Sequence, residues 1–342
     1  MTLVKQVRFG KTGIKISPII IGCMSFGDPK WQPWILEDEE KVFEILKYAY
    51  DHGLRTFDTA DVYSNGKSER LLGKFLKKYN IKRETVVIMT KIHFSVDEDM
   101  KIIPGDWFPS LDTKEGIQLA NQQGLSRKHI IAGVKNSIER LGTYIDVLQI
   151  HRLDHDTPMK EIMKTLNWVV EQGYARYIGA STMRATEFVE LQMIADKYNW
   201  FQFVNLQTQY NLLYREDERD LIPYAKRHSL AMTPWSPNAH GQLTRPVSQQ
   251  TQTERGSFGM SFLPMSDANK TIISRVEELS KKYNVSMATI STAWVLSKKF
   301  CPIVGMNSVS RVEDAIKATK IQLTENDIKY LEEPYQPTKY LI

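Results

Sequence analysis

The sequence predicts an α/β protein, a closed (β/α)8 TIM barrel in which eight parallel strands alternate with helices. Short apolar runs without polar alternation recur along the 342 residues, as expected of strands that are covered on both faces. Segments with apolar residues at helical spacing separate these runs. The runs number eight, the count of a closed barrel. A doubly wound open sheet is the alternative, but no Gly-x-Gly-x-x-Gly motif follows an early strand.

A small hairpin is expected before the barrel. Residues 6–9 and 14–17 alternate in polarity on either side of Gly13, which supplies a turn. Beyond this hairpin the whole chain, residues 1–342, is expected to form one domain.

Strands and helices then follow one another with clear end signals. Gly53 ends the first helix, Ser126 is expected to cap a later one, and Gly142 ends it. The strands are expected at residues 18–21, 56–60, 86–90, 146–150, 177–180, 203–206, 230–234 and 302–304. The helices are expected at residues 37–52, 67–79, 126–141, 158–172, from about 186, 216–228 and 310–319.

Two connections are much longer than the others. They cover residues 93–125 and 236–266, and each follows a strand. Loops of this length in a compact domain are usually functional lids or disordered. Because they follow strands, both should lie on the C-terminal face of the barrel, where barrel enzymes place their sites.

Composition argues for a soluble cytoplasmic protein. The net charge is +5 with acidic and basic residues mixed, so no basic tract indicates nucleic acid. No apolar run approaches the roughly 20 residues that span a bilayer. Lys5 and Arg8 leave no room for a signal-peptide apolar region. The cysteines, Cys23 and Cys301, fit a reducing compartment. The oligomeric state stays open.

The strands end in residues that suit a site. A single polar residue at a strand end is more often structural, but seven unusual residues on one rim indicate function. These strand-end residues are Asp58, Lys91, His151, Ser181, Gln207, Trp235 and Gly305.

Four side chains near these ends could perform acid–base chemistry. Tyr63 follows Asp58 by five residues. An ammonium beside the phenol, such as Lys91, would lower its pKa, and Asp58 would hold that ammonium in place. The His151 imidazole could orient a carbonyl oxygen or share its proton. Such a set suits proton donation to a carbonyl oxygen while a cofactor supplies hydride to the carbon.

These motifs resemble the tetrad segments of the aldo-keto reductases. The matching segments are Asp-Thr-Ala-Asp-Val-Tyr at 58–63, Thr-Lys at 90–91 and Gln-Ile-His at 149–151, and the similarity runs from about residue 9 to 315. Three further segments, 121–129, 149–156 and 205–211, resemble the fungal aryl-alcohol dehydrogenase-like branch.

The resemblance implies roles for the four side chains. Tyr63 becomes the proton donor, Lys91 and Asp58 set its acidity, and His151 orients the carbonyl. The implied reaction is NADPH-dependent reduction of aldehydes to primary alcohols, or the reverse oxidation of aryl alcohols.

Cofactor positions also carry over. Ser181 and Gln207 are expected to hold the nicotinamide carboxamide, and Trp235 to stack on the ring. Arg311 is expected at the 2′-phosphate, since a guanidinium at a helix N-terminus suits a phosphate. The alternative is a surface charge near Glu313 and Asp314. The other positions implied by the resemblance are Gly22, Cys23, Met24, Thr182, Ser236, Pro237, Leu243, Arg245, Arg255, Gly305, Asn307 and Asp314.

Three positions depart from the family pattern. Thr182 stands where many members carry Asn, Met306 where some carry a polar or basic residue, and Ala315 where the family has Asn. The tetrad residues themselves do not depart.

The segment 151–156 could alone suggest metal ligands, since it contains His151, Asp154, His155 and Asp156. No metal is expected, because residues beyond the strand end enter a turn and would not converge. His155 and Asp156 are instead expected to cap the helix that starts at Pro158.

Aromatic residues of the irregular segments suggest a flat pocket for an aromatic or aliphatic aldehyde. They are Trp31, Trp34, Trp107 and Phe108, and the equal alternative is that they pack the loops onto the barrel. A cofactor-sensing protein similar to the potassium-channel β-subunits is the alternative function. A barrel isomerase without nicotinamide would leave Ser181, Gln207 and Trp235 without a shared purpose.

Overall fold

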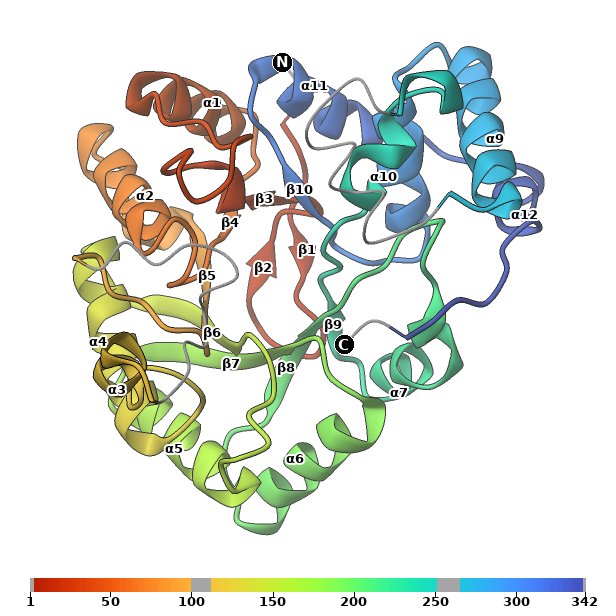
Figure 1. Cartoon of the computed structure of the whole chain (residues 1–342). Coiled ribbons are helices and arrows are strands. Elements are labelled where there is room, and N and C mark those ends of the chain that lie inside the picture. The colour runs from red at the N-terminus through yellow and green to blue at the C-terminus, as the bar shows by residue number, and fades with distance from the viewer. Residues whose placement is uncertain (1–2, 100–111, 251–264, 341–342) are drawn as a thin grey trace.

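A barrel of eight parallel strands lies at the centre of the protein (Figure 1). The computed structural model describes residues 3–99, 112–250 and 265–340. The spatial order of the strands is β10-β3-β4-β5-β6-β7-β8-β9, so neighbours in sequence are neighbours in space. The strands are β3 (Ile20–Gly22), β4 (Thr56–Asp58), β5 (Val87–Ile92), β6 (Ile145–Ile150), β7 (Ala175–Ser181), β8 (Phe203–Gln207), β9 (Ala231–Met232) and β10 (Ile303–Gly305).

Backbone hydrogen bonds join the two edges of this sheet. Cys301 N–H donates to the carbonyl of Met232 over 2.9 Å, and Ile303 N–H donates to the carbonyl of Pro234 over 2.8 Å. These bonds link the β9 segment to the β10 segment and close the barrel. The predicted (β/α)8 fold is therefore confirmed.

Helices surround the barrel (Figure 1). Polar caps mark their starts: Asp38, Ser126 and Ser308 each accept a hydrogen bond from the backbone of the first turn, and Gly142 ends its helix at positive φ. The α-helices are α1 (Glu39–Asp51), α2 (Lys67–Lys78), α3 (Lys114–Leu119), α4 (Arg127–Leu141), α5 (Met159–Glu171), α6 (Ala185–Lys197), α7 (Leu221–Arg227), α9 (Asp267–Tyr283), α10 (Met287–Ser297), α11 (Val309–Ala318) and α12 (Glu325–Glu332). The 3-10 turns are η1 (Cys23–Ser25), η2 (Arg83–Thr85), η3 (Glu216–Arg219), η4 (Ala239–Thr244) and η5 (Val247–Gln249). Within the ranges that the structure describes, no helix combines the length and the apolar character needed to span a membrane.

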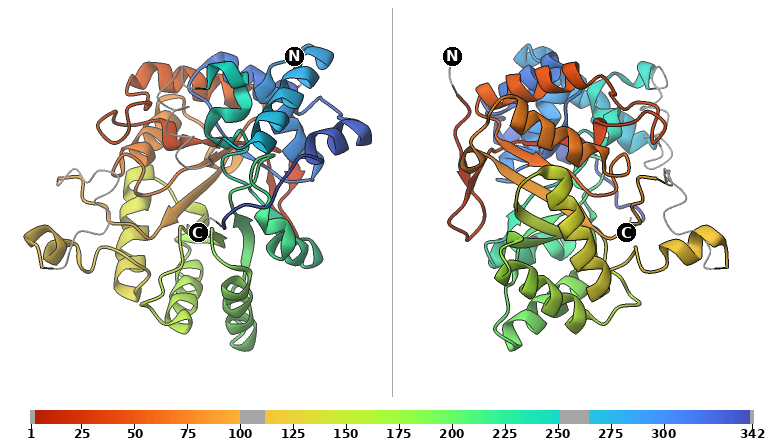
Figure 2. Two further views of the ribbon diagram at one scale, coloured as in Figure 1. Left: turned by 45° about the vertical axis from the view of Figure 1, so that its right-hand side comes forward. Right: turned by 90° about the vertical axis from the view of Figure 1, so that its left-hand side faces the viewer.

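The predicted hairpin is present and closes the N-terminal end of the barrel. Strands β1 (Val7–Arg8) and β2 (Lys15–Ile16) pair antiparallel. Phe9 and Ile16 are fully buried against apolar side chains from the lower part of the barrel strands. In the right-hand view of Figure 2 the hairpin lies on one side of the molecule and α3 on the opposite side.

The same strands change from apolar to polar toward their C-terminal ends. Met89 belongs to the apolar cluster beneath the hairpin, whereas Lys91, two residues on, does not. Val147 belongs to it as well, and Gln149 and His151 follow at the same period of two. Since alternate strand residues share a face, polar groups gather inside the C-terminal end of the barrel.

Some predicted elements differ in the structure. The helix expected at 216–228 is split into η3 and α7, because Asp220 leaves helical geometry and its carboxylate caps the N–H of Leu221. Of the strand expected at 230–234, only Ala231–Met232 is regular. Helices α9 and α10 follow β9, and helix α12 follows α11. No range is predicted for α9, α10 or α12.

Candidate functional site

An ammonium lies between a carboxylate and a phenol at the C-terminal end of the barrel. Lys91 ends the inward face of β5, and its Nζ is 2.5 Å from Asp58 Oδ1, at the end of β4. The same Nζ donates to the carbonyl of Thr59 over 2.8 Å and to the Tyr63 hydroxyl over 3.2 Å. The structure therefore brings together three of the four residues that the sequence places in one site.

Burial and the neighbouring groups together set the charge state of this site. Burial acts to lower the pKa of Lys91, but the charges of Asp58 and Tyr63 outweigh it and raise that pKa. Burial raises the pKa of Tyr63, and Lys91 offsets only part of that effect. The ammonium thus acts on the phenol in the predicted direction, but burial outweighs it and the net pKa of Tyr63 is raised. Tyr63 keeps its proton at neutral pH, as a proton donor must.

His151 completes the group. Its ring centroid lies 5.9 Å from that of Tyr63, with the two rings nearly perpendicular. Burial, followed by the charges of Lys91 and Arg152, holds the pKa of His151 well below its usual value. The imidazole is thus neutral at pH 7. Its Nδ1 is buried and has no hydrogen-bond partner in the described part of the chain.

Aromatic rings contact Tyr63 and His151. The Trp31 ring lies edge-on to Tyr63 at 6.0 Å between centroids, and Phe94 contacts His151 at 5.1 Å. Trp34 is half-buried in the same loop as Trp31. Trp107 and Phe108 lie outside the described residues. Trp31 thus lies beside Tyr63, and Phe94, which the sequence did not single out, lies beside His151.

A chain of buried amides extends the site across the barrel. Asp58 Oδ2 accepts hydrogen bonds from Gln149 over 3.1 Å and from Gln207 over 2.8 Å. Asn205 adds a further amide, 2.9 Å from Gln149. Of these three amides, only Gln207 has a role predicted from the sequence. The spacing could have revealed the others, since Gln149 and Asn205 each precede a candidate residue by two positions.

The rim beside Gln207 holds the residues predicted at the nicotinamide. Trp235 follows β9, and its indole N–H donates to Thr182 Oγ1 over 3.0 Å. Thr182 has a φ of 26° and follows Ser181, the last residue of β7. Register pairs Ser181 with Gln207. Thr182 therefore anchors the indole that the sequence predicts to stack on the cofactor.

Strand β3, the first strand of the barrel, and the loop after β9 border the same rim. Gly22 pairs in register with Asp58, and η1 follows with Cys23 fully buried and Met24 half-buried. Burial, then Asp58, raises the pKa of the Cys23 thiol, so it stays neutral.

In the loop after β9, Leu243 is fully buried and can offer only its backbone to a ligand. Ser236 has a φ of 55°, and its hydroxyl accepts from the N–H of His240, while the adjacent Pro237 is buried.

Two guanidinium groups lie near one another beyond this loop. Burial and then the charge of Arg311 lower the pKa of Arg245. Arg311, in the first turn of α11, has no carboxylate within 4 Å in the part of the chain described. Glu313 accepts instead from the Tyr48 hydroxyl, and Asp314 pairs with Lys317.

The remaining predicted cofactor positions near α11 differ in exposure. Gly305 is exposed, Asn307 is half-buried, and Met306 and Ala315 are buried in the core. Met306 and Ala315, two of the departures from the family pattern, therefore lie in the core. Arg255 lies outside the described residues.

The polar side chains of segment 151–156 bond to different parts of the chain. Asp154 accepts from the N–H of Leu125 and from Thr157, and His155 pairs with Glu187. Among the residues that the structure describes, no group of three His, Cys, Asp or Glu side chains could hold a metal ion. The expected cap on α5 is wrong, because Pro158 is the N-cap and the described residues show no side-chain cap hydrogen bond there.

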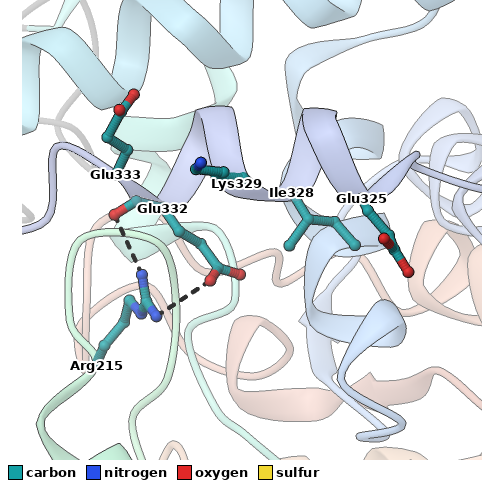
Figure 3. Close-up of a pocket in the computed structure, with 6 residues that line it drawn as sticks. All are labelled: Arg215, Glu325, Ile328, Lys329, Glu332 and Glu333. Carbon is teal, nitrogen blue, oxygen red and sulfur yellow. Dashed lines mark hydrogen bonds and ion pairs between the residues drawn. The ribbon is translucent and has the colours of Figure 1, made fainter.

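A separate pocket of about 440 Å³ lies against α12 (Figure 3). Arg215 donates there to the Glu332 carbonyl over 3.4 Å and to its carboxylate over 3.3 Å. None of the predicted site residues lines it. It is distinct from the candidate site.

Comparisons with known proteins agree with this geometry. The family model described as "Aldo/keto reductase family" matches residues 18–336. A Saccharomyces cerevisiae protein named "Putative aryl-alcohol dehydrogenase AAD16" is 60% identical over 342 residues, covering 99% of each chain. "Versiconal hemiacetal acetate reductase" of Aspergillus parasiticus is 49% identical over 341 residues, covering 97% of each chain. The chain belongs to the aldo/keto reductase family.

Proposed function

We propose that this oxidoreductase reduces aldehydes to primary alcohols with NADPH, and oxidises the alcohols in reverse. The observation that carries the proposal is the hydrogen bond between Lys91 and the Tyr63 hydroxyl, with Asp58 on the other side of the ammonium. A neutral phenol beside a buried cation can give its proton, because the cation stabilises the phenolate that remains.

Each residue of the group has one task in this proposal. Tyr63 donates its proton to the carbonyl oxygen, and Lys91 stabilises the resulting phenolate. Asp58 keeps Lys91 charged and in place. His151, which is neutral, donates a hydrogen bond that orients the carbonyl oxygen toward Tyr63.

The donor set of the rim fits a nicotinamide cofactor. When bound, NADPH would supply the hydride. Gln207 directs its Nε2 to Asp58, and no donor in the described chain reaches its Oε1, so that oxygen suits a carboxamide N–H2. Ser181 would offer a further hydrogen bond, and Trp235 an aromatic face.

Phosphate recognition would come from the arginines. Arg311 has no carboxylate partner in the described chain, and Arg245 lies near enough for the two charges to repel. An anion between two cations relieves that repulsion, which supports NADPH over NADH because only NADPH carries the additional 2′-phosphate. Other backbone and side-chain positions of the predicted set would line the nucleotide.

The substrate class follows from the rings beside Tyr63. Trp31 and Phe94 offer apolar faces next to the proton donor, which supports an aromatic or aliphatic aldehyde. A relative named as an aryl-alcohol dehydrogenase supports the same class. We also propose that residues 1–342 form one catalytic domain, in keeping with the family match over 18–336.

The test is NADPH oxidation with 4-nitrobenzaldehyde and veratraldehyde by the wild type and by Tyr63→Phe. Loss of a general acid should lower kcat about 10³-fold, while the NADPH dissociation constant should change less than threefold. Tyr50→Phe is the matched control, since its hydroxyl bonds to Thr85 near η2, away from the site. Wild-type turnover by Tyr63→Phe would refute the proton-donor role. A wild type that binds NADPH but turns over no aldehyde would favour the cofactor-sensing alternative.

A further inference from the structure

Gln149 lies at the centre of a buried hydrogen-bond network inside the barrel. It is fully buried on β6, beside Lys91 in register. Its Nε2 donates to Asp58 Oδ2 over 3.1 Å. Its Oε1 accepts from Gln207 over 3.0 Å and from Asn205 over 2.9 Å. Gln149 thus contacts both the carboxylate beside Lys91 and the amide proposed to hold the cofactor.

The carboxylate sets the direction of every amide in the network. An ionised carboxylate only accepts hydrogen bonds, so both Gln149 and Gln207 must present their N–H groups to Asp58. Gln149 then presents its oxygen to the other amides, and Asn205 must donate to it. The remaining N–H of Asn205 donates to Thr233 Oγ1 over 3.0 Å. A consequence is that Gln207 Oε1 faces away from Asp58 and remains an acceptor.

The barrel leaves room for this network at one glycine. A Cβ on Gly179 would lie 1.9 Å from Asn205 Oδ1 and 3.1 Å from Cγ of Gln149. No side chain larger than hydrogen fits on β7 at this level. Gly179 therefore leaves the space that the amides occupy inside the barrel.

We propose that Gln149 is a positioning residue that holds Asp58 and Gln207 in one arrangement. It acts through those residues and contacts neither substrate nor cofactor. The inference rests on the proposed function, because it assigns Gln207 to the nicotinamide end of the cofactor. It goes beyond that function by linking the proton-donor group to the cofactor group through one buried amide.

Gln149→Met tests the proposal, since methionine keeps the approximate volume and removes the hydrogen bonds. The dissociation constants of NADPH and NADH should both rise about fivefold, because the nicotinamide end is common to both. The kcat for 4-nitrobenzaldehyde should fall about tenfold, with its KM changed less than twofold. Cofactor fluorescence titration and steady-state kinetics supply these values.

The matched control is Gln192→Met. Gln192 is also buried, and its amide makes two hydrogen bonds to the backbone of Phe203, away from the site. This variant should lose similar stability in thermal unfolding and keep both cofactor affinities within twofold. A general loss of packing would instead weaken binding equally in the two variants, and that result would overturn the proposal.

Gln149→Glu gives a second measurement should the methionine variant fail to fold. A protonated glutamic acid donates and accepts as the amide does, whereas the carboxylate cannot donate to Asp58. Burial and Asp58 favour the neutral acid, and Lys91 opposes them; Tyr63 and His151 are the other titratable groups nearby. Cofactor affinity should approach that of the wild type at about pH 6 and fall several-fold by about pH 9, while the wild type changes less than twofold.

Two further results would overturn the inference. One is a folded Gln149→Met protein that binds both cofactors as the wild type does. The other is a Gln149→Glu protein whose affinity does not depend on pH. Failure of the proposed function is distinguishable, because it appears in the wild type itself, as absence of cofactor binding or of turnover.

Discussion

The two ends of the candidate cofactor site balance their charges differently. The catalytic end holds Asp58, Lys91, Tyr63 and His151, and its ammonium and carboxylate are paired and almost fully buried. The arginine end holds Arg245 and Arg311. There, Arg311 is exposed and has no carboxylate within 4 Å in the ranges described.

This difference distinguishes groups that the fold fixes before a ligand arrives from groups that provide affinity for the ligand. Groups that stabilise a developing charge work best when the fold fixes them before the ligand arrives. Groups that provide affinity can remain uncompensated until an anion binds, because that anion then removes the repulsion between them. The catalytic end should therefore respond to mutation in rate and stability, and the arginine end in affinity alone.

The largest expected effect is that of Lys91→Met at the catalytic end. We expect kcat to fall about 10³-fold, because the phenolate loses its cation. The free energy of unfolding should fall by about 3 kcal/mol, since Asp58 stays buried without its counter-ion. Stopped-flow reduction of 4-nitrobenzaldehyde and urea unfolding measure the two effects.

The control for this variant is Lys74→Met. Lys74 pairs with Glu39 over 2.7 Å on the surface, where both side chains are at least 40% exposed. An exposed pair contributes less than about 1 kcal/mol. Equal losses of unfolding free energy in the two variants would show that the buried Lys91–Asp58 pair stabilises the fold no more than the exposed Lys74–Glu39 pair does.

Arg311→Ala should have the next largest effect, at the arginine end. We expect the NADPH dissociation constant to rise about 10- to 100-fold, because a charged hydrogen bond to phosphate is lost, with little change for NADH. Stability should not fall, since the substitution removes a charge that repels Arg245. Isothermal titration with both cofactors and thermal unfolding test this.

Arg176→Ala, an exposed arginine that bonds to the carbonyl of Gly173, controls for the loss of one positive charge. If Arg311→Ala weakens NADPH and NADH equally, the phosphate role is refuted.

The two ends also differ in how far the sequence predicts them. The carboxyl ends of parallel strands must lie together, so strand-end logic alone brings Asp58, Lys91 and His151 to one rim. The arginine end follows a loop and a helix start, whose positions depend on tertiary packing. Arg311 was therefore expected only through resemblance, and nothing local in the sequence places it near Arg245.

Two further features escaped sequence reasoning for physical reasons. Helix α10 is buried on nearly all sides, with Ile290, Thr292 and Trp294 all inaccessible, so it carries no amphipathic period. The amide network was missed because polar residues within short apolar strands were weighed only at strand ends. Counting back by two from Gln207 and His151 identifies Asn205 and Gln149.

A smaller effect is expected from Gly179→Ala, which disturbs the network behind the catalytic end. The added Cβ would overlap Asn205 Oδ1, so the amides must shift, at a cost of about 1–3 kcal/mol in unfolding free energy. NADPH and NADH should weaken together, unlike with Arg311→Ala. Gly13→Ala, whose Cβ meets nothing within 4 Å, should be neutral to about 0.5 kcal/mol. Unchanged binding of both cofactors by Gly179→Ala would contradict the link between the buried amide network and cofactor binding.

The smallest effect concerns acid pH, which should act on the catalytic end and leave the arginines charged. Burial lowers the pKa of His93 to about 4 against the pull of Asp154, and it also lowers the pKa values of His129 and His151. Between the unfolded value of 6.5 and about 4, the unfolded chain therefore binds more protons than the folded one, so stability falls as pH falls.

For His93 alone, this linkage lowers the unfolding free energy by about 1 kcal/mol between about pH 7.5 and pH 5.5. His93→Gln removes that contribution, so urea unfolding of this variant should depend on pH less steeply than unfolding of the wild type. Identical pH slopes would mean that His93 titrates alike in both states. In that case burial would not oppose protonation of His93, and the response of this part of the barrel to acid would rest on the other buried histidines, His129 and His151.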